Sequence, residues 1–302
     1  MKSEQLRVAY LGPQGTYTHQ AAVAKFKDSP AEFVPCDTIA LTFESVCQNQ
    51  VDFACIPLEN SLHGSVIETF DLLRDGRIVT IGGESVMGIE HCLVVCRGIT
   101  MGDIKRALSH EQALGQCRGF LSMNLPNVVQ VRTSSTASAA EQLLELLKAG
   151  DPSARHSAAV CSRVCADLHE ELEVLQSGIQ DGEINFTRYI VLSKAPLLLH
   201  PRSATLQRAL LRCVLPLGRD APVSLTSVFR LFPEDIQVMR VDRRPALSGT
   251  PFHDCVFLEV ECSPLISCNT DIGQLWRDKL AAAVEAINAG IGLPCCHILG
   301  AW

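Results

Sequence analysis

Three polar side chains with chemical potential lie close together where a glycine-containing turn runs into an apolar stretch. They are Asn185, Thr187 and Arg188, which stand directly before or at the start of the apolar run 189–192. Because side chains alternate along a strand, we expect Asn185 and Thr187 on one face and Arg188 on the other. Polar groups buried there without partners would each cost about 2 kcal/mol or more. Taken alone, the stretch indicates equally an edge strand with a solvated start and a binding site.

The composition favours a folded protein with a largely aliphatic core. The chain has 302 residues, of which 47% are hydrophobic and 5% aromatic, and its net charge is −7. This length fits two domains, and the acidic charge without a basic cluster argues against nucleic acid or an anionic membrane as partner. No signal-peptide core or membrane-length apolar run is present, so we expect a cytoplasmic protein.

Fourteen cysteines are present, but none forms a Cys-x-x-Cys pair. Most stand in apolar runs and are expected to be small buried hydrophobic residues in a reducing compartment. Cys92 follows His91, yet the spacing of the cysteines does not suit a closed zinc site, and we predict no metal site.

Strands and helices alternate through the first 195 residues, which is typical of an α/β protein with an open, mostly parallel sheet. Strands are expected at 6–11, 33–35, 51–58, 78–82, 91–96, 128–131, 158–161 and 189–192. Helices are expected at 20–26, 38–49, 67–73, 104–107, 109–121, 133–148 and 162–167.

Three of the strand-to-helix turns, at 12–18, 59–65 and 133–138, carry small and hydroxyl-bearing residues. Unpaired amides and the helix dipole favour anions at such positions, and ligands of open α/β sheets bind at the carboxyl ends of strands. Each turn alone is more often structural, for example a helix start capped by Thr16 or Thr18. Together with Arg188 as a countercharge, they indicate a pocket for a small polyanion.

A proline-bearing linker at 196–204 precedes a smaller C-terminal unit. Its expected elements are strand 209–216, helix 222–232, strands 236–241 and 253–261, helix 270–289 and strand 296–299. This βαββαβ order is typical of a ferredoxin-like fold. No nucleophile and base are apparent there, so a binding or assembly module is expected.

Six ordered segments resemble the prephenate dehydratase family. They are residues 10–18, 56–66, 110–117, 133–140, 185–189 and 298–302. The resemblance implies a catalytic domain at 1–195, folded like a type 2 periplasmic binding protein, with lobes of about 1–87 plus 180–195 and 88–179. It also implies an ACT regulatory and dimerisation domain at 205–302, which would form a homodimer or homotetramer.

The implied reaction removes carbon dioxide and water from prephenate to give phenylpyruvate, a step of phenylalanine biosynthesis, without a cofactor. We expect Thr187 to donate a hydrogen bond to the leaving hydroxyl, as a group that stabilises developing charge. The residues expected to bind the substrate are Thr16, Asn60, Ser61, Ser134, Ser135, Thr136, Asn185 and Arg188.

The departures from the family pattern lie mainly in the C-terminal unit. The residues expected to bind an L-phenylalanine effector are Ala221, Pro222, Val223, Asp242, Arg243, Arg244 and Pro245. A bulky Arg243 stands where the family has serine, which leaves inhibition by phenylalanine open. In the catalytic motif, Tyr189 replaces the usual phenylalanine.

Two alternatives remain open from the sequence. The first is arogenate dehydratase, which performs the same reaction on the aminated substrate. The second is a non-catalytic sensor of a small acid, against which Asn185, Thr187 and Arg188 argue. A fused chorismate mutase is not expected, because no long helical segment precedes Tyr10.

Overall fold

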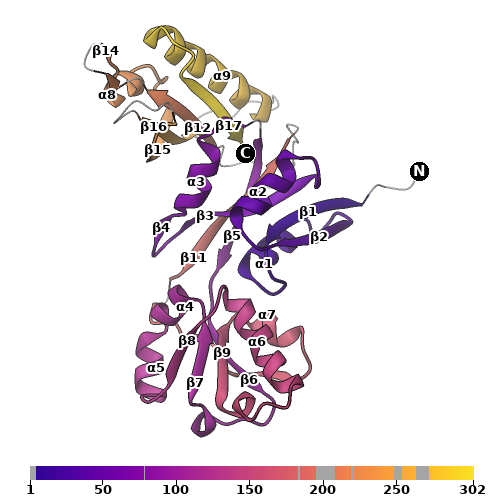
Figure 1. The fold of residues 1–302 in the computed structure, drawn as a ribbon. Helices are drawn as coiled ribbons and strands as arrows, with labels where there is room; N and C mark the ends of the chain where they lie inside the picture. Colours follow the sequence, from indigo (N-terminus) through magenta and orange to yellow (C-terminus); the bar gives the residue numbers. More distant parts are fainter. Residues whose placement is uncertain are drawn as a thin grey trace. The chain divides into compact units, whose positions relative to one another are not determined.

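The computed structural model is mixed α/β (Figure 1). It describes residues 5–77, 79–182, 184–194, 208–215, 217–218, 221–247, 254–262 and 272–302. The chain forms two compact units. The first contains the chain up to Thr42 together with Cys55–Gly64 and Ser85–Tyr189, and the second contains Phe43–Ala54, Ser65–Glu84 and the chain from Ile190 onward. The predicted linker 196–204 lies outside the described residues, and the predicted domain boundaries remain predictions.

The N-terminal segments and β11 build a six-stranded sheet. Its order is β2 (Ala31–Cys36), β1 (Leu6–Leu11), β3 (Phe53–Asn60), β11 (Phe186–Ser193) and β5 (Thr80–Gly88), with β4 (Gly64–Ser65) paired to β3. The helices of this part of the chain are α1 (Tyr17–Lys25), α2 (Ile39–Cys47) and α3 (Ile67–Leu73). The predicted strand 6–11 and helix 67–73 are confirmed to the residue. β11 follows β5 by about a hundred residues, yet it lies between β3 and β5.

Helix α1 starts immediately after the glycine turn because the turn supplies its cap. Thr16 accepts a hydrogen bond from the backbone N–H of His19 at 3.2 Å and donates to the carbonyl of Leu11 at 2.9 Å. Gly15 has φ +91°, a left-handed conformation that an L side chain rarely adopts. A Cβ there would also lie 3.0 Å from the Cys165 sulfur. The turn is therefore fixed by sterics and by its own cap.

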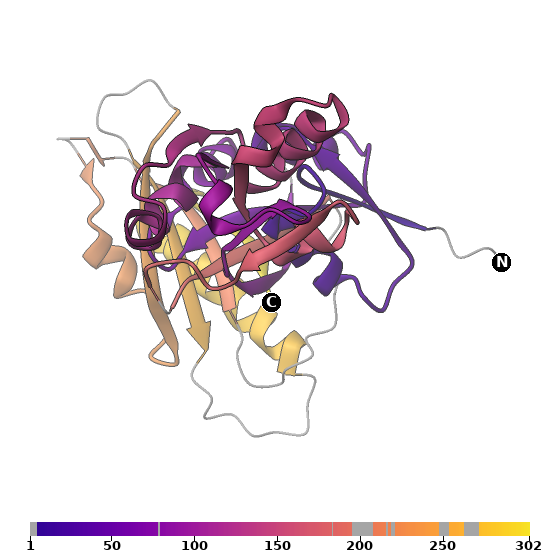
Figure 2. The same cartoon turned by 90° about the horizontal axis from the view of Figure 1, so that it is seen from below.

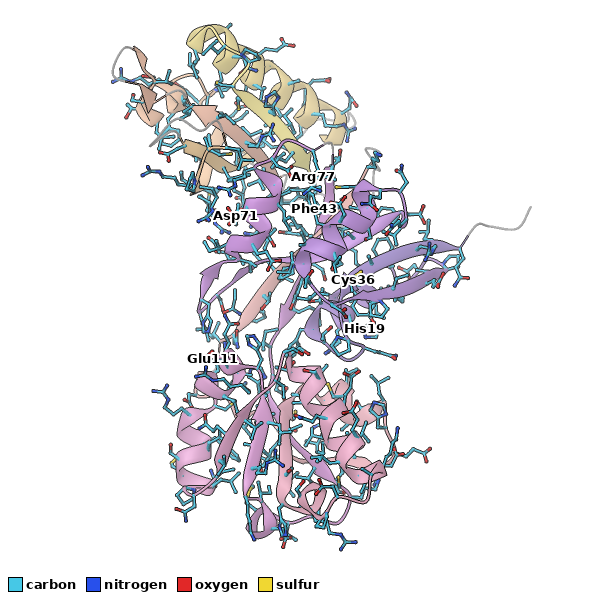
Figure 3. All side chains as sticks on the ribbon, in the orientation of Figure 1. His19, Cys36, Phe43, Asp71, Arg77 and Glu111 are labelled. Carbon is cyan, nitrogen blue, oxygen red and sulfur yellow. The ribbon has the colours of Figure 1, made fainter. Side chains whose placement is uncertain are left out.

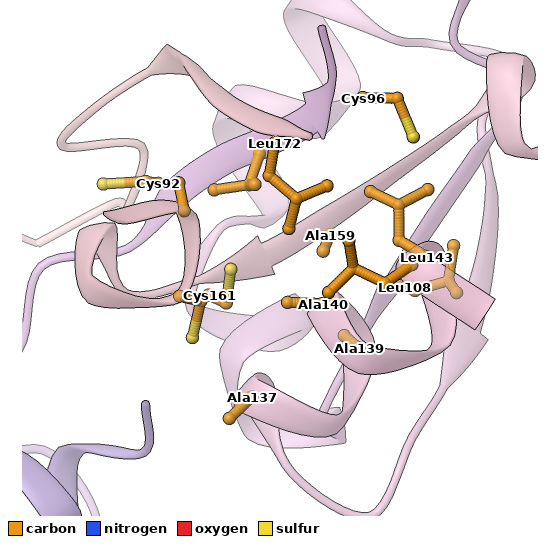
Figure 4. Close-up of a cluster of buried hydrophobic side chains, with 14 of the residues drawn as sticks. Cys92, Cys96, Leu108, Ala137, Ala139, Ala140, Leu143, Ala159, Cys161 and Leu172 are labelled. Atoms are coloured by element: carbon orange, nitrogen blue, oxygen red, sulfur yellow. The ribbon is translucent and has the colours of Figure 1, made fainter. Parts of the chain in front are cut away.

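The middle of the chain builds a five-stranded sheet with helices on both faces. Its order is β10 (Leu172–Gln176), β6 (Cys92–Cys96), β9 (Ser157–Cys161), β7 (Arg106–Ser109) and β8 (Val129–Arg132). The helices are α4 (Glu111–Gln116), α5 (Arg118–Asn124), α6 (Thr136–Lys148) and α7 (Arg163–Asp167). Because side chains alternate along β6, Cys92 and Val94 belong to a buried hydrophobic cluster that includes residues of α6 and is drawn in Figure 4. Leu93 and Val95 belong to a second buried hydrophobic cluster, which includes residues of α4 and α5. Both faces of β6 are therefore buried. The sheet is mixed, because β6 is antiparallel to β9 and β10, whereas β7 is parallel to β8 and β9.

Two predictions for this sheet need correction. The predicted helix 104–107 is wrong, because residues 106–109 form strand β7, which pairs in parallel with β8 and β9. Ala107, Leu108 and Ser109 are fully buried there, and a short apolar run buried on both faces carries no period that separates strand from helix. Strand β10 was not predicted, and it pairs antiparallel with β6.

The C-terminal part forms a four-stranded sheet in the order β15 (Ile236–Pro245), β16 (Asp254–Cys262), β12 (Arg208–Leu215) and β17 (Cys296–Ala301). β16 is antiparallel to both β12 and β15, so β12 and β15 run parallel, as in a split βαβ unit. The predicted βαββαβ order is thus confirmed. Helix α9 (Ile272–Ile291) packs Trp276, Leu280 and Ile287 onto the sheet, and Figure 2 shows it in yellow beside the strands. The helix predicted at 222–232 is shorter, α8 (Leu225–Phe229), and a small hairpin of β13 (Leu217–Gly218) and β14 (Ala221–Pro222) precedes it.

Candidate active site

Asn60 and Thr187 are brought together by the end of β3 and the start of β11. The amide oxygen of Asn60 accepts hydrogen bonds from the backbone N–H groups of Leu62 and His63, at 3.0 and 3.1 Å. This fixes the amide orientation, since the oxygen is engaged by two donors. The Asn60 nitrogen then donates to Thr187 Oγ1 at 3.0 Å and to Asn185 Oδ1 at 2.8 Å. The Thr187 oxygen therefore accepts a hydrogen bond from Asn60, and its own hydroxyl proton points elsewhere.

The donor and acceptor positions of Asn185, Gln116 and His91 follow from the same reasoning. Because Asn185 Oδ1 is an acceptor, its nitrogen donates to Gln116 Oε1, at 3.1 Å. Gln116 Oε1 also lies 2.7 Å from His91 Nε2, which must therefore carry a proton. His91 is 2% exposed, and this burial lowers its pKa, so the ring is neutral at pH 7 and Nδ1 is unprotonated. Nδ1 faces the hydroxyl of Tyr17 at 3.2 Å.

These contacts form one continuous network. Asn60 donates to both Thr187 and Asn185, and Gln116 Oε1 accepts from Asn185 and His91. Asn185 and Thr187 are buried, at 4% and 8% exposure, while Phe186 between them is 46% exposed. The predicted sharing of one strand face by Asn185 and Thr187 is confirmed. All members of the network belong to the first compact unit. Buried polar side chains whose orientations are mutually determined form a rigid site.

Ser61 extends this arrangement at the backbone of β11. Its hydroxyl accepts from the N–H of Phe186 at 2.9 Å, and its own N–H donates to the Phe186 carbonyl at 2.8 Å. Ser61 thus holds the strand that carries Thr187, and its side chain is already engaged by the backbone.

Arg188 lies on the strand face opposite to Thr187 and is paired with a carboxylate. Its Nη1 is 3.0 Å from Glu59 Oε2, and the two side chains are 17% and 28% exposed. Glu59 was not singled out in the sequence, because nothing local distinguishes it from other acidic residues near strand ends. The ion pair means that Arg188 is a positioned, partly neutralised cation.

The remaining predicted substrate-binding residues lie at the starts of α1 and α6. Ser135 is the N-cap of α6 and accepts from the Ser138 N–H at 3.0 Å, and the Ser134 hydroxyl donates to Ser138 Oγ at 3.0 Å. Thr136 is the first residue of α6, and Thr16 caps α1. Within the part of the chain that the structure describes, no hydrogen bond joins these four to Thr187.

A pocket of about 520 Å³ opens beside this network. It is lined by His63, His110, Glu111, Gln112, Gly115 and Gln116. Glu111 is labelled in Figure 3 at the start of α4, where it forms an ion pair with Arg132 at 3.0 Å. Gln116 belongs both to the pocket and to the network, so it connects a ligand-sized space to Thr187. Gln112 and Gln116 lie within the helix predicted at 109–121, but the link between Gln116 and Asn185 arises only in the folded chain.

The residues predicted to bind an effector lie in the second unit. Arg244 makes a two-pronged ion pair with Asp71 of α3, in which Nε and Nη2 each lie 2.8 Å from a carboxylate oxygen. Asp242 accepts a hydrogen bond from the hydroxyl of Ser65. Asp71 is labelled in Figure 3.

The other members of this set differ in surroundings. Arg243 pairs with Asp254 at 2.5 Å, and the Pro245 carbonyl accepts from Arg74 at 2.7 Å. Ala221 and Pro222 form β14, and Val223 packs against the core of the C-terminal sheet. Three residues of the predicted effector set, Asp242, Arg244 and Pro245, thus contact segments that precede residue 85.

No cluster of three or more metal-binding side chains occurs among the described residues. The thirteen cysteines that the structure describes are all free thiols. In the same residues, every helix is too short or too polar to span a bilayer.

Comparison with known proteins identifies the family. The family model for prephenate dehydratase matches residues 8–197. The bifunctional chorismate mutase/prephenate dehydratase of Aquifex aeolicus (strain VF5) is 35% identical over 245 residues, which cover 80% of this chain and 62% of that protein. The chloroplastic arogenate dehydratase/prephenate dehydratase 6 of Arabidopsis thaliana is 31% identical over 245 residues, covering 81% and 56%. This chain therefore spans less than two thirds of the length of either curated relative.

A solved structure extends the similarity to the C-terminal part. Prephenate dehydratase from Arthrobacter aurescens, crystallised in complex with L-Phe, superimposes with a TM-score of 0.80 at 28% identity. The match covers 98% of this chain and 89% of that one. The fold, the ordered motifs and the family match over residues 8–197 lead to one conclusion: this chain belongs to the prephenate dehydratase family.

Proposed function

We propose that the protein is a prephenate dehydratase, a carbon–oxygen lyase that converts prephenate to phenylpyruvate, carbon dioxide and water. The observation that carries the proposal is the hydrogen-bond network that contains Thr187 and borders the pocket through Gln116. Asn60 donates to Thr187, so the threonine proton is available to the hydroxyl that leaves the ring. Loss of carbon dioxide supplies the electron pair that forms the aromatic ring as the hydroxyl departs. Aromatisation drives the reaction, and the chain needs only to orient the substrate and stabilise the leaving oxygen.

The pocket supplies groups suited to an anionic substrate. Gln116 Oε1 accepts from Asn185 and His91, and among the described residues its Nε2 donors make no hydrogen bond, so we propose that this pocket-lining group contacts the ligand. His63 and His110 add further donors on the pocket wall. We assign Thr187 the catalytic role, with Asn60 and Asn185 orienting it. Arg188 and the helix starts at Thr16 and 134–136 are proposed to provide the positive potential that attracts the two carboxylates of the substrate. Ser61, in the turn after β3, is proposed to bind the substrate through its position beside β11.

We assign the C-terminal sheet to an ACT domain that pairs subunits into a homodimer or homotetramer. Its strand order and its βαββαβ sequence support this assignment. Met239 and Val241 are 55% and 44% exposed on β15, an edge strand of the described sheet, and exposed apolar side chains on an edge favour association. L-Phenylalanine is proposed as its effector, by similarity to the Arthrobacter aurescens protein. The free thiols support a reducing compartment, and we propose the cytoplasm.

The test measures phenylpyruvate formation from prephenate and phenylalanine formation from arogenate by the purified protein, and it repeats the prephenate assay with added phenylalanine. Turnover of prephenate is expected. Conversion of arogenate alone would assign the protein to the sister activity. A folded protein that consumes neither substrate would favour a small-acid sensor. Inhibition by phenylalanine would support the effector assignment.

A further inference from the structure

Gln116 stands where the hydrogen-bond network meets the pocket. It is the last residue of α4, and its side chain lines the pocket of about 520 Å³. A glutamine amide has one oxygen with two acceptor positions and one nitrogen with two donor protons. The oxygen accepts from His91 Nε2 at 2.7 Å and from Asn185 Nδ2 at 3.1 Å, so both acceptor positions are occupied. Gln116 therefore offers the pocket hydrogen-bond donors and no acceptor.

The nearer of the two partners, His91, is itself held in place through its backbone and its ring. Its backbone N–H donates to Gln180 Oε1 at 2.9 Å, and its carbonyl accepts from the N–H of Ile179 at 3.0 Å. The ring packs edge-on against Tyr17, whose hydroxyl donates to the Glu90 carbonyl at 2.6 Å. The Nε2–H group of His91 is therefore a donor in a fixed position.

This fixed donor decides which way round the Gln116 amide stands. If the amide were reversed, its nitrogen would face the N–H groups of His91 and Asn185, and donors would meet donors. The buried N–H groups would then lack acceptors, which is unfavourable. The observed orientation satisfies His91 and Asn185 and turns the amide nitrogen toward the pocket.

We propose that His91 is a positioning residue for substrate binding: with Asn185, it holds Gln116 in the orientation that presents both amide protons to a carboxylate oxygen of the substrate. This inference rests on the proposed function, in which the ligand carries two carboxylates. A carboxylate only accepts hydrogen bonds, so an amide that only donates is suited to it. An ammonium group, which only donates, finds no acceptor in Gln116.

The experiment compares kcat/KM for prephenate in His91→Asn and His91→Gln, two amide side chains that differ by one methylene group. The glutamine nitrogen can reach the position of the histidine Nε2, whereas the asparagine nitrogen reaches only the position of Nδ1. We expect kcat/KM to fall about tenfold in His91→Asn, because Gln116 loses one of the donors that orient it. It should stay within about twofold of the wild type in His91→Gln. Equal losses in the two variants, or no loss in either, would overturn the inference.

A Gln116→Leu background separates positioning from a general structural effect of residue 91. The difference in kcat/KM between His91→Asn and His91→Gln should vanish in this background, because both substitutions act through the Gln116 amide. A difference that persists would show a structural role for His91 and overturn the inference.

Gln116→Glu tests the need for donors without changing His91, and it keeps the inference testable where His91→Asn does not fold. One carboxylate oxygen can still accept from His91 and Asn185, while the other replaces the donors that face the pocket. We expect kcat/KM to fall about tenfold or more, and a wild-type value would overturn the inference. In all these cases wild-type turnover of prephenate leaves the proposed function standing. A folded wild type that consumes neither prephenate nor arogenate would overturn the proposed function, and this inference with it.

Discussion

Asn60→Asp should invert the hydrogen bonding of Thr187 while hardly changing the shape of residue 60. The oxygen held by Leu62 and His63 is retained. The nitrogen that donates to Asn185, Thr187 and the Phe186 carbonyl, at 2.8, 3.0 and 3.1 Å, becomes an oxygen that cannot donate. Thr187 can then form a hydrogen bond with the new carboxylate only as the donor, and its hydroxyl proton is no longer directed at the substrate.

The magnitude follows from the contacts. Two N–H donors are lost, worth about 1 kcal/mol each, and the buried Asn185 oxygen is left facing a carboxylate, at about 1–3 kcal/mol. We expect the free energy of unfolding to fall by about 3–5 kcal/mol in total. Loss of the oriented Thr187 proton should lower kcat by about 100-fold or more.

Denaturant titration with an unchanged m-value measures the stability change, and phenylpyruvate formation measures kcat. Asn127→Asp is the matched control, because it makes the same chemical change at an exposed turn residue of the first unit. It should alter the unfolding free energy by about 0.5 kcal/mol or less. An Asn60→Asp protein with wild-type stability and kcat would refute the assignment of the Asn60 amide as a donor to Thr187.

Three further outcomes are expected. Glu59→Gln should lower the unfolding free energy by about 1–2 kcal/mol in denaturant, because Arg188 loses its charged partner while remaining largely buried; no change would contradict the ion pair. Arg244→Lys should lower the unfolding free energy by about 1–2 kcal/mol, because an ammonium group cannot make the two-pronged contact with Asp71. The same substitution at the exposed Arg230 should leave the unfolding free energy nearly unchanged in the same titration. Because the pKa of His91 is lower in the folded than in the unfolded chain, the unfolded chain binds a proton more readily, and the stability present above about pH 6.5 is lost as the pH falls toward the folded pKa. The melting temperature should therefore fall less between pH 7.5 and pH 5.5 in His91→Gln than in the wild type. Equal falls in the two proteins would contradict this.

Periodicity and turn chemistry predicted most of the fold. Strand 6–11, helix 67–73 and the order of the C-terminal elements came from local patterns, and the structure confirms them. Strand β7 was misassigned, because a four-residue strand with three consecutive buried residues carries no helical or strand period.

The site was only partly predictable, for a different reason. Asn60, Asn185 and Thr187 were found from their residue types at strand ends, and the structure joins them. Gln116 and His91 were missed as members, because their roles depend on partners 69 and 25 residues away. Side-chain orientations that depend on hydrogen bonds between distant segments cannot be predicted from a single segment of sequence.

The most direct test of the central claim compares kcat and substrate affinity in Thr187→Ala and Thr187→Ser. If the oriented Thr187 proton carries the reaction, Thr187→Ala should lower kcat by about 100-fold or more, with the dissociation constant for prephenate, measured by calorimetry, changed about threefold or less. Thr187→Ser keeps the hydroxyl and should recover most of the lost kcat. Wild-type turnover in Thr187→Ala would contradict the assignment of Thr187 to the chemistry.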